Sequence, residues 1–291
     1  MYALRKQRTI LAPVEVKGFG LWSGRDVSVE FRPAAVDSGI VFVRRDLPAQ
    51  PRIAALVGNR VETPRRTTLS AGGGSVEMVE HVLAALAGMR IDNCEVWVDQ
   101  AEMPGCDGSS QPFVAALETV GTQEQEALRK MLVVRSVTRL GDDESWVEAR
   151  PSTTLGLSVK FRLDYGRHTS IGRQTLQLAI TPDSFRRELA GSRTFMLEEE
   201  AQWLISRGMG TRATHQDVLV FAKEGPIDNP LRFRDECVRH KTLDLVGDLA
   251  LTGCDVVGHI IAHRSGHRLN AELVRALLNE EEVVDTWRKS A

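Results

Sequence analysis

The sequence predicts an α+β fold made of two similar small α/β domains, and three observations indicate this. Each half of the chain opens with segments of alternating polar and apolar residues, which are typical of half-buried strands, and continues with helical patterns. The stretch LSVKFR at residues 157–162 is similar to VSVEFR at residues 27–32, and the polar stretch GTQEQEALRK at residues 121–130 separates the halves. We therefore expect domains over residues 1–124 and 125–291, with a functional site where the two face each other.

The first half predicts several strands and two helices. VEVKG, VSVEFRPA and GIVFVRR alternate between polar and apolar residues and are joined by Gly, Asp and Pro turns. A helix is expected over residues 75–87, because Ser75 can cap it and apolar residues from Val79 to Leu86 recur at helical spacing. A strand, NCEVWVD, follows. The helix SQPFVAALETV comes next, with Ser110 as its cap and a proline in its first turn.

The second half predicts the same order of elements. Asp235 is expected to cap a helix that runs to about Ala250. Gly253 then precedes a strand, VVGHIIAH, and a turn leads into a last helix capped by Asn270.

Composition excludes several classes of protein. The 37 Lys and Arg residues nearly balance the 39 Asp and Glu residues, so no net field favours nucleic acid or an anionic membrane. No segment approaches 18 uninterrupted apolar residues, and the amino terminus lacks the apolar region of a signal peptide. The 4 cysteines are too widely spaced for a disulfide framework. We therefore expect a cytoplasmic protein with reduced thiols and no membrane span, and a monomer, since no long apolar face is left over.

Two motifs suggest a ligand site at first sight, but the residues around them argue against it. GFGLWSG at residues 18–24 is similar to a dinucleotide-binding loop, but a strand-like segment follows it where pyrophosphate binding needs a helix, so we expect a hairpin or loop. His259, His263 and His267 recur every four residues and would stack on one face of a helix. The Val and Ile residues between them favour a strand, so we expect only His267, at the edge of the last helix, to be functional.

Three residues of metal-binding type lie on two of the predicted helices. His240 and Asp244, four residues apart in CVRHKTLDLVGD, stack on one helix face. A catalytic zinc usually takes three protein ligands and a water, and His81, beside Glu80 in MVEHVLAAL, is the candidate third ligand. Each part has a simpler interpretation: a single His on an apolar helix is often a core residue, and a His/Asp pair at this spacing often only stabilises its helix.

The motifs taken together resemble the UDP-3-O-acyl-N-acetylglucosamine deacetylases, the zinc amidases that commit a sugar nucleotide to lipid A synthesis. VEHVLAALAG-RIDN, E-MP--DGSSQPFV, SRTF, DE-VRHK-LDL-GDL and SGH-LN occur in the family's order between about Arg8 and Asn270. The resemblance implies two-layer α/β domains whose helical layers are sandwiched together, with the metal site at the domain interface. It implies one zinc per chain, held by His81, His240 and Asp244, with ferrous iron as an alternative for such a site.

The resemblance also implies catalytic roles in hydrolysing the substrate's acetamide to UDP-3-O-acyl-glucosamine and acetate. Glu80 matches the general base, which takes a proton from the attacking water. Thr194 and Lys241 match groups that stabilise the oxyanion together with the zinc. His267 matches the acid that protonates the departing amine, and Asp248 matches the carboxylate that orients this His.

For the substrate, the resemblance implies a UDP-acyl-sugar whose 3-O-acyl chain lies in an apolar passage of the second domain. Phe195 matches a wall residue of that passage, and Gly210 and Thr214 are further candidates for substrate binding. Residues 206–221 depart from the family's Gly-Gly-Ser/Asp-Asn pattern, and Trp22 replaces a His usual in the family's Gly-Leu-His-Ser-Gly loop. The acyl-chain length and the shape of the passage therefore stay open.

Two alternatives follow from these departures and from the metal site. The protein would be a related amidase if it acts on a different acylated amino-sugar nucleotide. It would be a zinc scaffold without catalysis if the site were structural, but structural sites usually have four protein ligands and need neither an acid nor a base.

Overall fold

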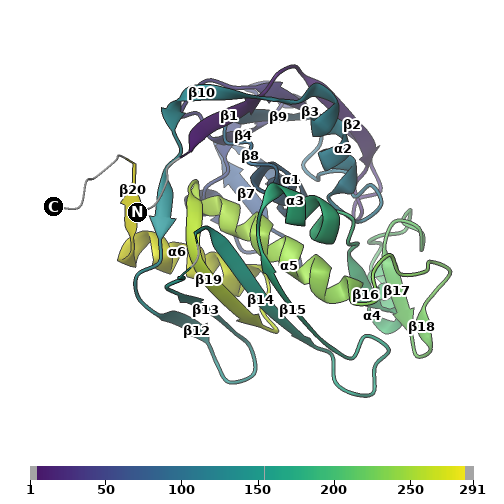
Figure 1. Ribbon diagram of the computed structural model, residues 1–291. Coiled ribbons are helices and arrows are strands. Elements are labelled where there is room, and N and C mark those ends of the chain that lie inside the picture. Colours follow the sequence, from purple (N-terminus) through teal and green to yellow (C-terminus); the bar gives the residue numbers. More distant parts are fainter. Residues whose placement is uncertain (1–4, 154, 286–291) are drawn as a thin grey trace.

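The computed structural model describes residues 5–153 and 155–285, in which two larger sheets lie on either side of a layer of helices (Figure 1). The first sheet has five strands in the order β2-β3-β9-β4-β5. Its strands are β2 (Val14–Phe19), β3 (Asp26–Pro33), β4 (Ile40–Arg44), β5 (Arg52–Ala54) and β9 (Cys94–Val98). The helices α1 (Glu80–Gly88) and α2 (Gln111–Val120) lie on its inner side.

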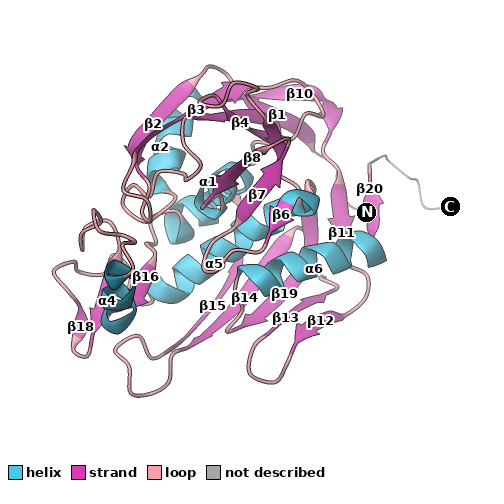
Figure 2. Cartoon of the chain, turned by 180° about the vertical axis from the view of Figure 1, so that it is seen from behind, coloured by secondary structure: helices cyan, strands magenta, loops and turns pink. Residues whose placement is uncertain are grey.

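The second sheet has seven strands in the order β12-β13-β19-β11-β20, with β14 also paired to β19 and β15 paired to β14. Its strands are β11 (Met131–Val133), β12 (Thr138–Gly141), β13 (Trp146–Arg150), β14 (Leu157–Asp164), β15 (Arg173–Ala179), β19 (Asp255–His263) and β20 (Glu282–Val284). The helices α5 (Glu236–Leu249) and α6 (His267–Glu280) cross its inner face (Figure 2).

The two sheets share one topology. In the first, β2-β3 and β3-β9 are antiparallel, β9-β4 is parallel and β4-β5 is antiparallel. In the second, β12-β13-β19-β14-β15 has the same order and the same directions. In each case one helix precedes the central strand and another follows it, so α1 corresponds to α5 and α2 to α6.

This topology corrects one detail of the sequence comparison. VSVEFR lies in β3, whose counterpart is β13, whereas LSVKFR lies in β14, whose counterpart is β4. The two similar stretches are therefore not equivalent strands. Alternating Val and Phe residues are common in half-buried strands, so such a short match does not show which strands of the two sheets correspond.

The polar stretch at residues 121–130 is not an open linker. Most of it forms β10 (Thr122–Leu128), which pairs antiparallel with β1 (Lys6–Ile10). Two smaller sheets complete the described chain. One has the strands β6 (Arg60–Val61), β7 (Thr68–Ala71) and β8 (Gly74–Glu77), and the other has β16 (Phe195–Leu197), β17 (Leu219–Ala222) and β18 (Gly225–Pro226). The remaining elements are the helices α3 (Pro182–Ser184) and α4 (Glu198–Ser206) and single turns at Val57–Asn59, Phe185–Leu189 and Ala250–Thr252.

Two of the predicted helix starts were wrong. Ser75 lies in β8, because residues 74–77 pair with β7 across a glycine turn, and α1 begins only at Glu80. Asn270 lies inside α6, which begins three residues earlier, at His267. Both residues are good caps by type, but pairing with a neighbouring strand and burial inside the protein decide their positions.

Two other caps stand where they were predicted but make different hydrogen bonds. Ser110 precedes α2, yet its hydroxyl donates to the carbonyl of His81, at 2.8 Å. Asp235 precedes α5, yet its carboxylate accepts from Nε of Arg239, at 2.6 Å. Residues 18–24 form the end of β2 and most of the turn that leads to its antiparallel partner β3, which confirms the predicted hairpin.

The packing of α1 against α5 brings the two halves of the chain together. Nearly every residue of α1 is buried. A Cβ atom at Gly247 of α5 would overlap the carbonyl oxygen of Glu80, so only glycine allows α5 to approach the start of α1 this closely. Within the described chain, no helix is both long and apolar enough to cross a bilayer.

Candidate metal centre

Three side chains from α1 and α5 converge on one point. One ligand atom each of His81, His240 and Asp244 lies within 4.8 Å of the other two. Oδ1 of Asp244 lies 3.3 Å from Nε2 of His240 and 3.6 Å from Nε2 of His81. All three side chains are buried, and this Oδ1 has no hydrogen-bond partner within the described chain. A buried carboxylate oxygen without a donor, facing two imidazole nitrogens, is what a metal ion would satisfy.

The protonation of these groups suits a cation. Nδ1 of His240 donates to the carbonyl of Ser192, at 3.1 Å, which leaves the lone pair of Nε2 free. Burial lowers the pKa of His240 to about 4, so this imidazole is neutral near pH 7. Burial by itself would raise the pKa of Asp244, but His240 and Lys241 outweigh it and hold this pKa well below its usual range. The residues therefore fit a divalent metal held by two imidazoles and one carboxylate.

Lys241 lies beside the carboxylate on the side away from the imidazoles. Its Nζ is 2.7 Å from Oδ2 of Asp244. Burial is the largest single effect and lowers the pKa of Lys241, but Asp244, Tyr165 and Asp248 together outweigh it and raise this pKa. Lys241 is therefore a fixed cation at the wall of the site.

A second group of ionisable side chains lies next to the first. Nδ1 of His267 lies 2.9 Å from Oδ2 of Asp248, and Nε2 of His267 lies 3.9 Å from Oε1 of Glu80. Burial lowers the pKa of His267, but the carboxylates of Asp248 and Glu80 outweigh it and raise this pKa to about 9. Burial also raises the pKa of Glu80. Asp248 is fully buried, so it is not a solvated carboxylate on the helix surface.

Both groups open into one cavity of about 940 Å³. Thr194 and Phe195 line it as well, and the Phe195 ring packs edge-on against His240, with centroids 6.2 Å apart. The lining also has four arginines and two large aromatic residues, namely Arg65, Arg173, Arg264, Arg268, Tyr165 and Trp22. The cavity therefore brings together a His/His/Asp group that could bind a metal, the Glu80–His267 pair and several arginines, of which Arg65 and Arg173 are paired with the lining carboxylates of Glu200 and Asp164.

A smaller, more apolar cavity of about 320 Å³ adjoins the first, and Leu21, Trp22 and Met196 line both. Gly210 and Thr214 line this second cavity. Of the three residues predicted for substrate binding, Phe195 thus lies beside the metal-binding group, while Gly210 and Thr214 lie in the apolar space next to it.

Comparison with known proteins identifies the family of the sequence. A family model described as UDP-3-O-acyl N-acetylglycosamine deacetylase matches residues 7–279. The chain belongs to this deacetylase family. Similar proteins, each named UDP-3-O-acyl-N-acetylglucosamine deacetylase, occur in Syntrophus aciditrophicus (36% identical, covering 95% of this chain and 87% of the relative), Anaeromyxobacter sp. strain Fw109-5 (41%, covering 94% and 88%) and Thermosynechococcus vestitus (38%, covering 94% of both).

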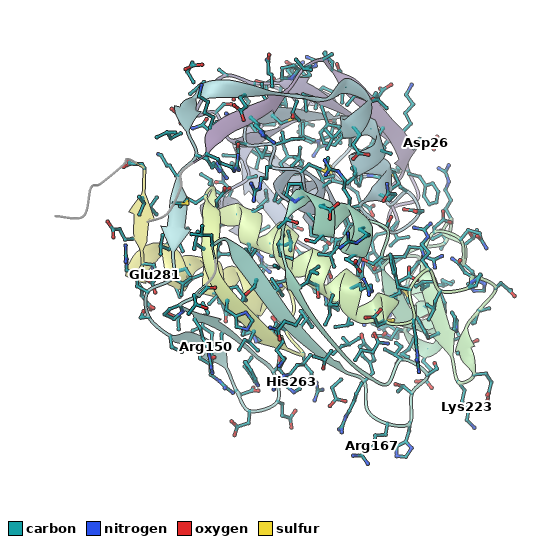
Figure 3. The ribbon with its side chains drawn as sticks, viewed as in Figure 1. Asp26, Arg150, Arg167, Lys223, His263 and Glu281 are labelled. Atoms are coloured by element: carbon teal, nitrogen blue, oxygen red, sulfur yellow. The ribbon has the colours of Figure 1, made fainter. Side chains whose placement is uncertain are left out.

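The family resemblance inferred from the sequence is thereby confirmed. The two histidines of β19 stay apart from the site: His259 shares a hydrogen bond with Ser158, at 2.6 Å between Nδ1 and Oγ, and His263 packs on Trp146. Figure 3 shows His263 on the side of the sheet that faces away from the helices. Of the three histidines in GHIIAHRSGH, His267 lines the cavity that also holds His81, His240 and Asp244.

In this deacetylase-family chain, the sequence did not predict the buried residues that contact and orient the side chains of the site. Arg193 is buried, and its Nε lies 2.7 Å from Oε1 of Glu236. This ion pair fixes the SRTF segment, whose first residue, Ser192, accepts from Nδ1 of His240 through its carbonyl. Thr67 is fully buried against Asp248. The only signal for Arg193 was its place in the SRTF motif, and Thr67 lies in no motif, so its contacts become visible only in three dimensions.

Proposed function

We propose that the protein is a zinc-dependent deacetylase that hydrolyses the acetamide of UDP-3-O-acyl-N-acetylglucosamine to UDP-3-O-acyl-glucosamine and acetate. One observation carries this proposal: two imidazoles and a carboxylate that suit a metal lie in one cavity with a buried glutamate and a carboxylate-bound histidine. The names of the relatives supply the substrate.

His81, His240 and Asp244 would hold the metal, which would supply Lewis acidity that makes water more acidic and polarises the acetyl carbonyl. Glu80 is the base, because its buried carboxylate adjoins His81 and faces the same cavity. As the water oxygen bonds to the acetyl carbon, Glu80 takes the proton that leaves this water.

The negative charge that develops on the acetyl oxygen needs fixed positive groups nearby. Lys241 supplies an ammonium whose own counter-ion, Asp244, is already in place. The hydroxyl of Thr194 lies on the cavity wall and donates a hydrogen bond to the same oxygen.

His267 completes the reaction as the acid. Its raised pKa keeps it protonated near pH 7, and Nε2 gives a proton to the amide nitrogen as the bond between this nitrogen and the acetyl carbon breaks. The products are a free amine on the sugar and acetate. Asp248 orients the imidazolium through Nδ1.

The two cavities suggest where the rest of the substrate lies. The arginines of the larger cavity suit the diphosphate of the UDP group, since guanidinium pairs well with phosphate. The smaller cavity, with Gly210 and Thr214 in its wall, suits the 3-O-acyl chain, and Phe195 marks the start of the passage. The proposal includes two domains, residues 1–124 and 125–291, with the metal between them and their helical layers sandwiched together. The repeated topology of the two sheets supports this division. A monomeric state remains a prediction.

A related amidase is the second candidate function, acting on a different acylated amino-sugar nucleotide. The observation that favours it is that Gly210, Ala213, Thr214 and His215, from the segment that departs from the family pattern, line the apolar cavity. Turnover of UDP-N-acetylglucosamine with and without the 3-O-acyl group separates the two candidates. Preference for the unacylated compound would favour the second.

Metal dependence tests the main proposal directly. Protein stripped of metal by a chelator is expected to lose hydrolysis of the acylated substrate and to regain it with one zinc per chain. Ferrous iron, added without oxygen, shows whether the same ligands accept the second metal. Full activity in the chelator-treated protein, with no metal bound, would contradict the proposal.

A further inference from the structure

We propose that Thr67 is a positioning residue that ties the acid side of the site to the base side. Its hydroxyl donates to Oδ1 of Asp248, at 2.6 Å, and lies 3.2 Å from Nδ1 of His267. Its backbone N–H donates to Oε2 of Glu80, at 3.0 Å. One residue thus contacts both the carboxylate that takes a proton and the carboxylate that orients the acid. This inference rests on the proposed function.

The two contacts are rigidly connected. Thr67 immediately precedes β7, and its carbonyl accepts from the backbone N–H of Val79, next to the start of α1, at 3.4 Å. The segment that carries the hydroxyl is therefore attached to the segment that carries Glu80. Because the N–H and the hydroxyl belong to the same residue, the hydroxyl holds Asp248 at a fixed place relative to the base.

Asp248 receives donors from both halves of the chain. Its Oδ2 accepts from Nδ1 of His267 and from Nδ2 of Asn270, at 2.9 Å and 2.8 Å, and both donors lie on α6. The Thr67 hydroxyl is the contact that comes from the first half of the chain. Without the Thr67 hydroxyl, Asp248 would keep its hydrogen bonds to His267 and Asn270 of α6, but the distance of this group from Glu80 would vary more.

Burial makes this hydroxyl hard to replace. Thr67 and Asp248 are both 0% exposed, so a solvent water does not reach Oδ1 in this arrangement. A carboxylate oxygen that loses its donor in such a place turns toward another donor. His267, bound to the same carboxylate, would then move relative to the leaving amine.

Three variants test this role. Thr67→Val keeps the shape and the backbone N–H but removes the hydroxyl, whereas Thr67→Ser keeps the hydroxyl. Thr68→Val is the matched control, because the Thr68 hydroxyl is also buried but has no hydrogen-bond partner within the described chain. Bound zinc and the thermal unfolding midpoint are measured for all three.

Thr67→Val is expected to lower kcat on the order of 10-fold, a size typical of losing a hydrogen-bond partner that orients the residues of a metal site. The KM and the zinc content should stay near those of the unchanged protein, and the unfolding midpoint should fall but stay well above the assay temperature, because a buried carboxylate loses a donor. Thr67→Ser should restore most of the activity, and Thr68→Val should have full activity. In an Asp248→Asn background, Thr67→Val should have little further effect, because the hydroxyl acts through this carboxylate.

A second readout needs no turnover. Long-range ¹H–¹⁵N NMR of the imidazoles should show the His267 Nδ1 signal shifted in Thr67→Val and unchanged in Thr68→Val, with a His267→Gln sample to assign it. Equal kcat and equal His267 spectra in Thr67→Val and Thr68→Val would overturn the inference. Failure of the unchanged, zinc-loaded protein to hydrolyse the acylated substrate would instead overturn the proposed function, and the NMR comparison would still decide the role of Thr67.

Discussion

Gly247 of α5 lies directly against the carbonyl oxygen of Glu80, with no room between them for a Cβ atom. The contact sets the separation of the two helices that carry the proposed ligands. Gly247→Ala should therefore force α5 away from the start of α1, which weakens both the packing and the metal site. Overpacking of this kind costs about 1–3 kcal/mol of unfolding free energy.

Denaturant unfolding and zinc titration measure the two effects of Gly247→Ala. The control is Gly39→Ala, since a Cβ at Gly39 meets nothing within 4 Å, although its positive φ of 65° adds some backbone strain. Gly247→Ala should weaken zinc binding, and Gly39→Ala should not. Unchanged zinc affinity in Gly247→Ala would show that α1 and α5 can separate without disturbing the ligands.

Glu80→Gln should separate metal binding from catalysis. The amide keeps the shape of the carboxylate but cannot take a proton from water, and loss of a general base typically costs about 10²- to 10⁴-fold in rate. Zinc content should be unchanged, because Glu80 is not among the three grouped ligand residues. Turnover and metal analysis are compared with Glu199→Gln, an exposed glutamate of α4. A zinc scaffold without catalysis predicts that the two variants behave alike.

The elements that the sequence predicted best are those with a regular apolar period. The strands in VEVKG, VSVEFR and VVGHIIAH form β2, β3 and β19, and the helix in CVRHKTLDLVGD forms most of α5, since alternation and helical spacing report burial directly. Helix starts were less predictable. Ser75 has the chemistry of a cap, but the glycine turn before it makes a hairpin, and pairing with β7 decides the outcome.

For the site, contacts between residues of one helix could be predicted, and contacts between distant segments of the chain could not. His240 and Asp244 are four residues apart on one helix, so their proximity follows from helix geometry. Thr67 and Asp248 are 181 residues apart, and their hydrogen bond depends on how α5 packs against the first half of the chain. Asn270 was expected as a cap because asparagine favours that role, yet its side-chain amide donates a hydrogen bond to Asp248.

The pH dependence of kcat/KM should report the protonation of His267. As the proposed acid, His267 acts while protonated, so activity falls as pH rises through its pKa, which lies at about 9. A bound divalent cation repels the imidazolium and lowers this pKa, so the fall is expected at or below pH 9 in the zinc-loaded protein.

Asp248→Asn should move this fall to lower pH. The carboxylate of Asp248 raises the pKa of His267, and the neutral amide does not, so the imidazolium loses its proton earlier as pH rises. The pH profile of Asp143→Asn, at an exposed aspartate, serves as the control and should match that of the unchanged protein. A fall that stays at the same pH in Asp248→Asn would show that another group is the acid.

Arg212 is expected to affect which acyl chains fit. Its Nη1 donates to the carbonyl of Gly24, at 2.9 Å, and lies 2.7 Å from Oδ1 of Asp26, while its guanidinium lies over the Phe19 ring at 4.3 Å. These contacts hold the segment that contains Gly210 against the β2–β3 hairpin, and both segments line the apolar cavity. Arg212→Ala should therefore loosen the wall of the proposed acyl passage.

The expected result for Arg212→Ala is a higher KM for the preferred acyl chain and a smaller difference in kcat/KM between shorter and longer chains. The fold should be unaffected, because an exposed ion pair contributes only about 0–1 kcal/mol. A series of substrates with different acyl lengths measures this, with Lys223→Ala as the control, since Figure 3 shows Lys223 at the edge of the molecule beyond β17 and β18. If Arg212→Ala keeps the same chain-length profile, the hairpin contact does not shape the passage, and chain selection must lie with residues deeper in the cavity, such as Leu204 and Val220.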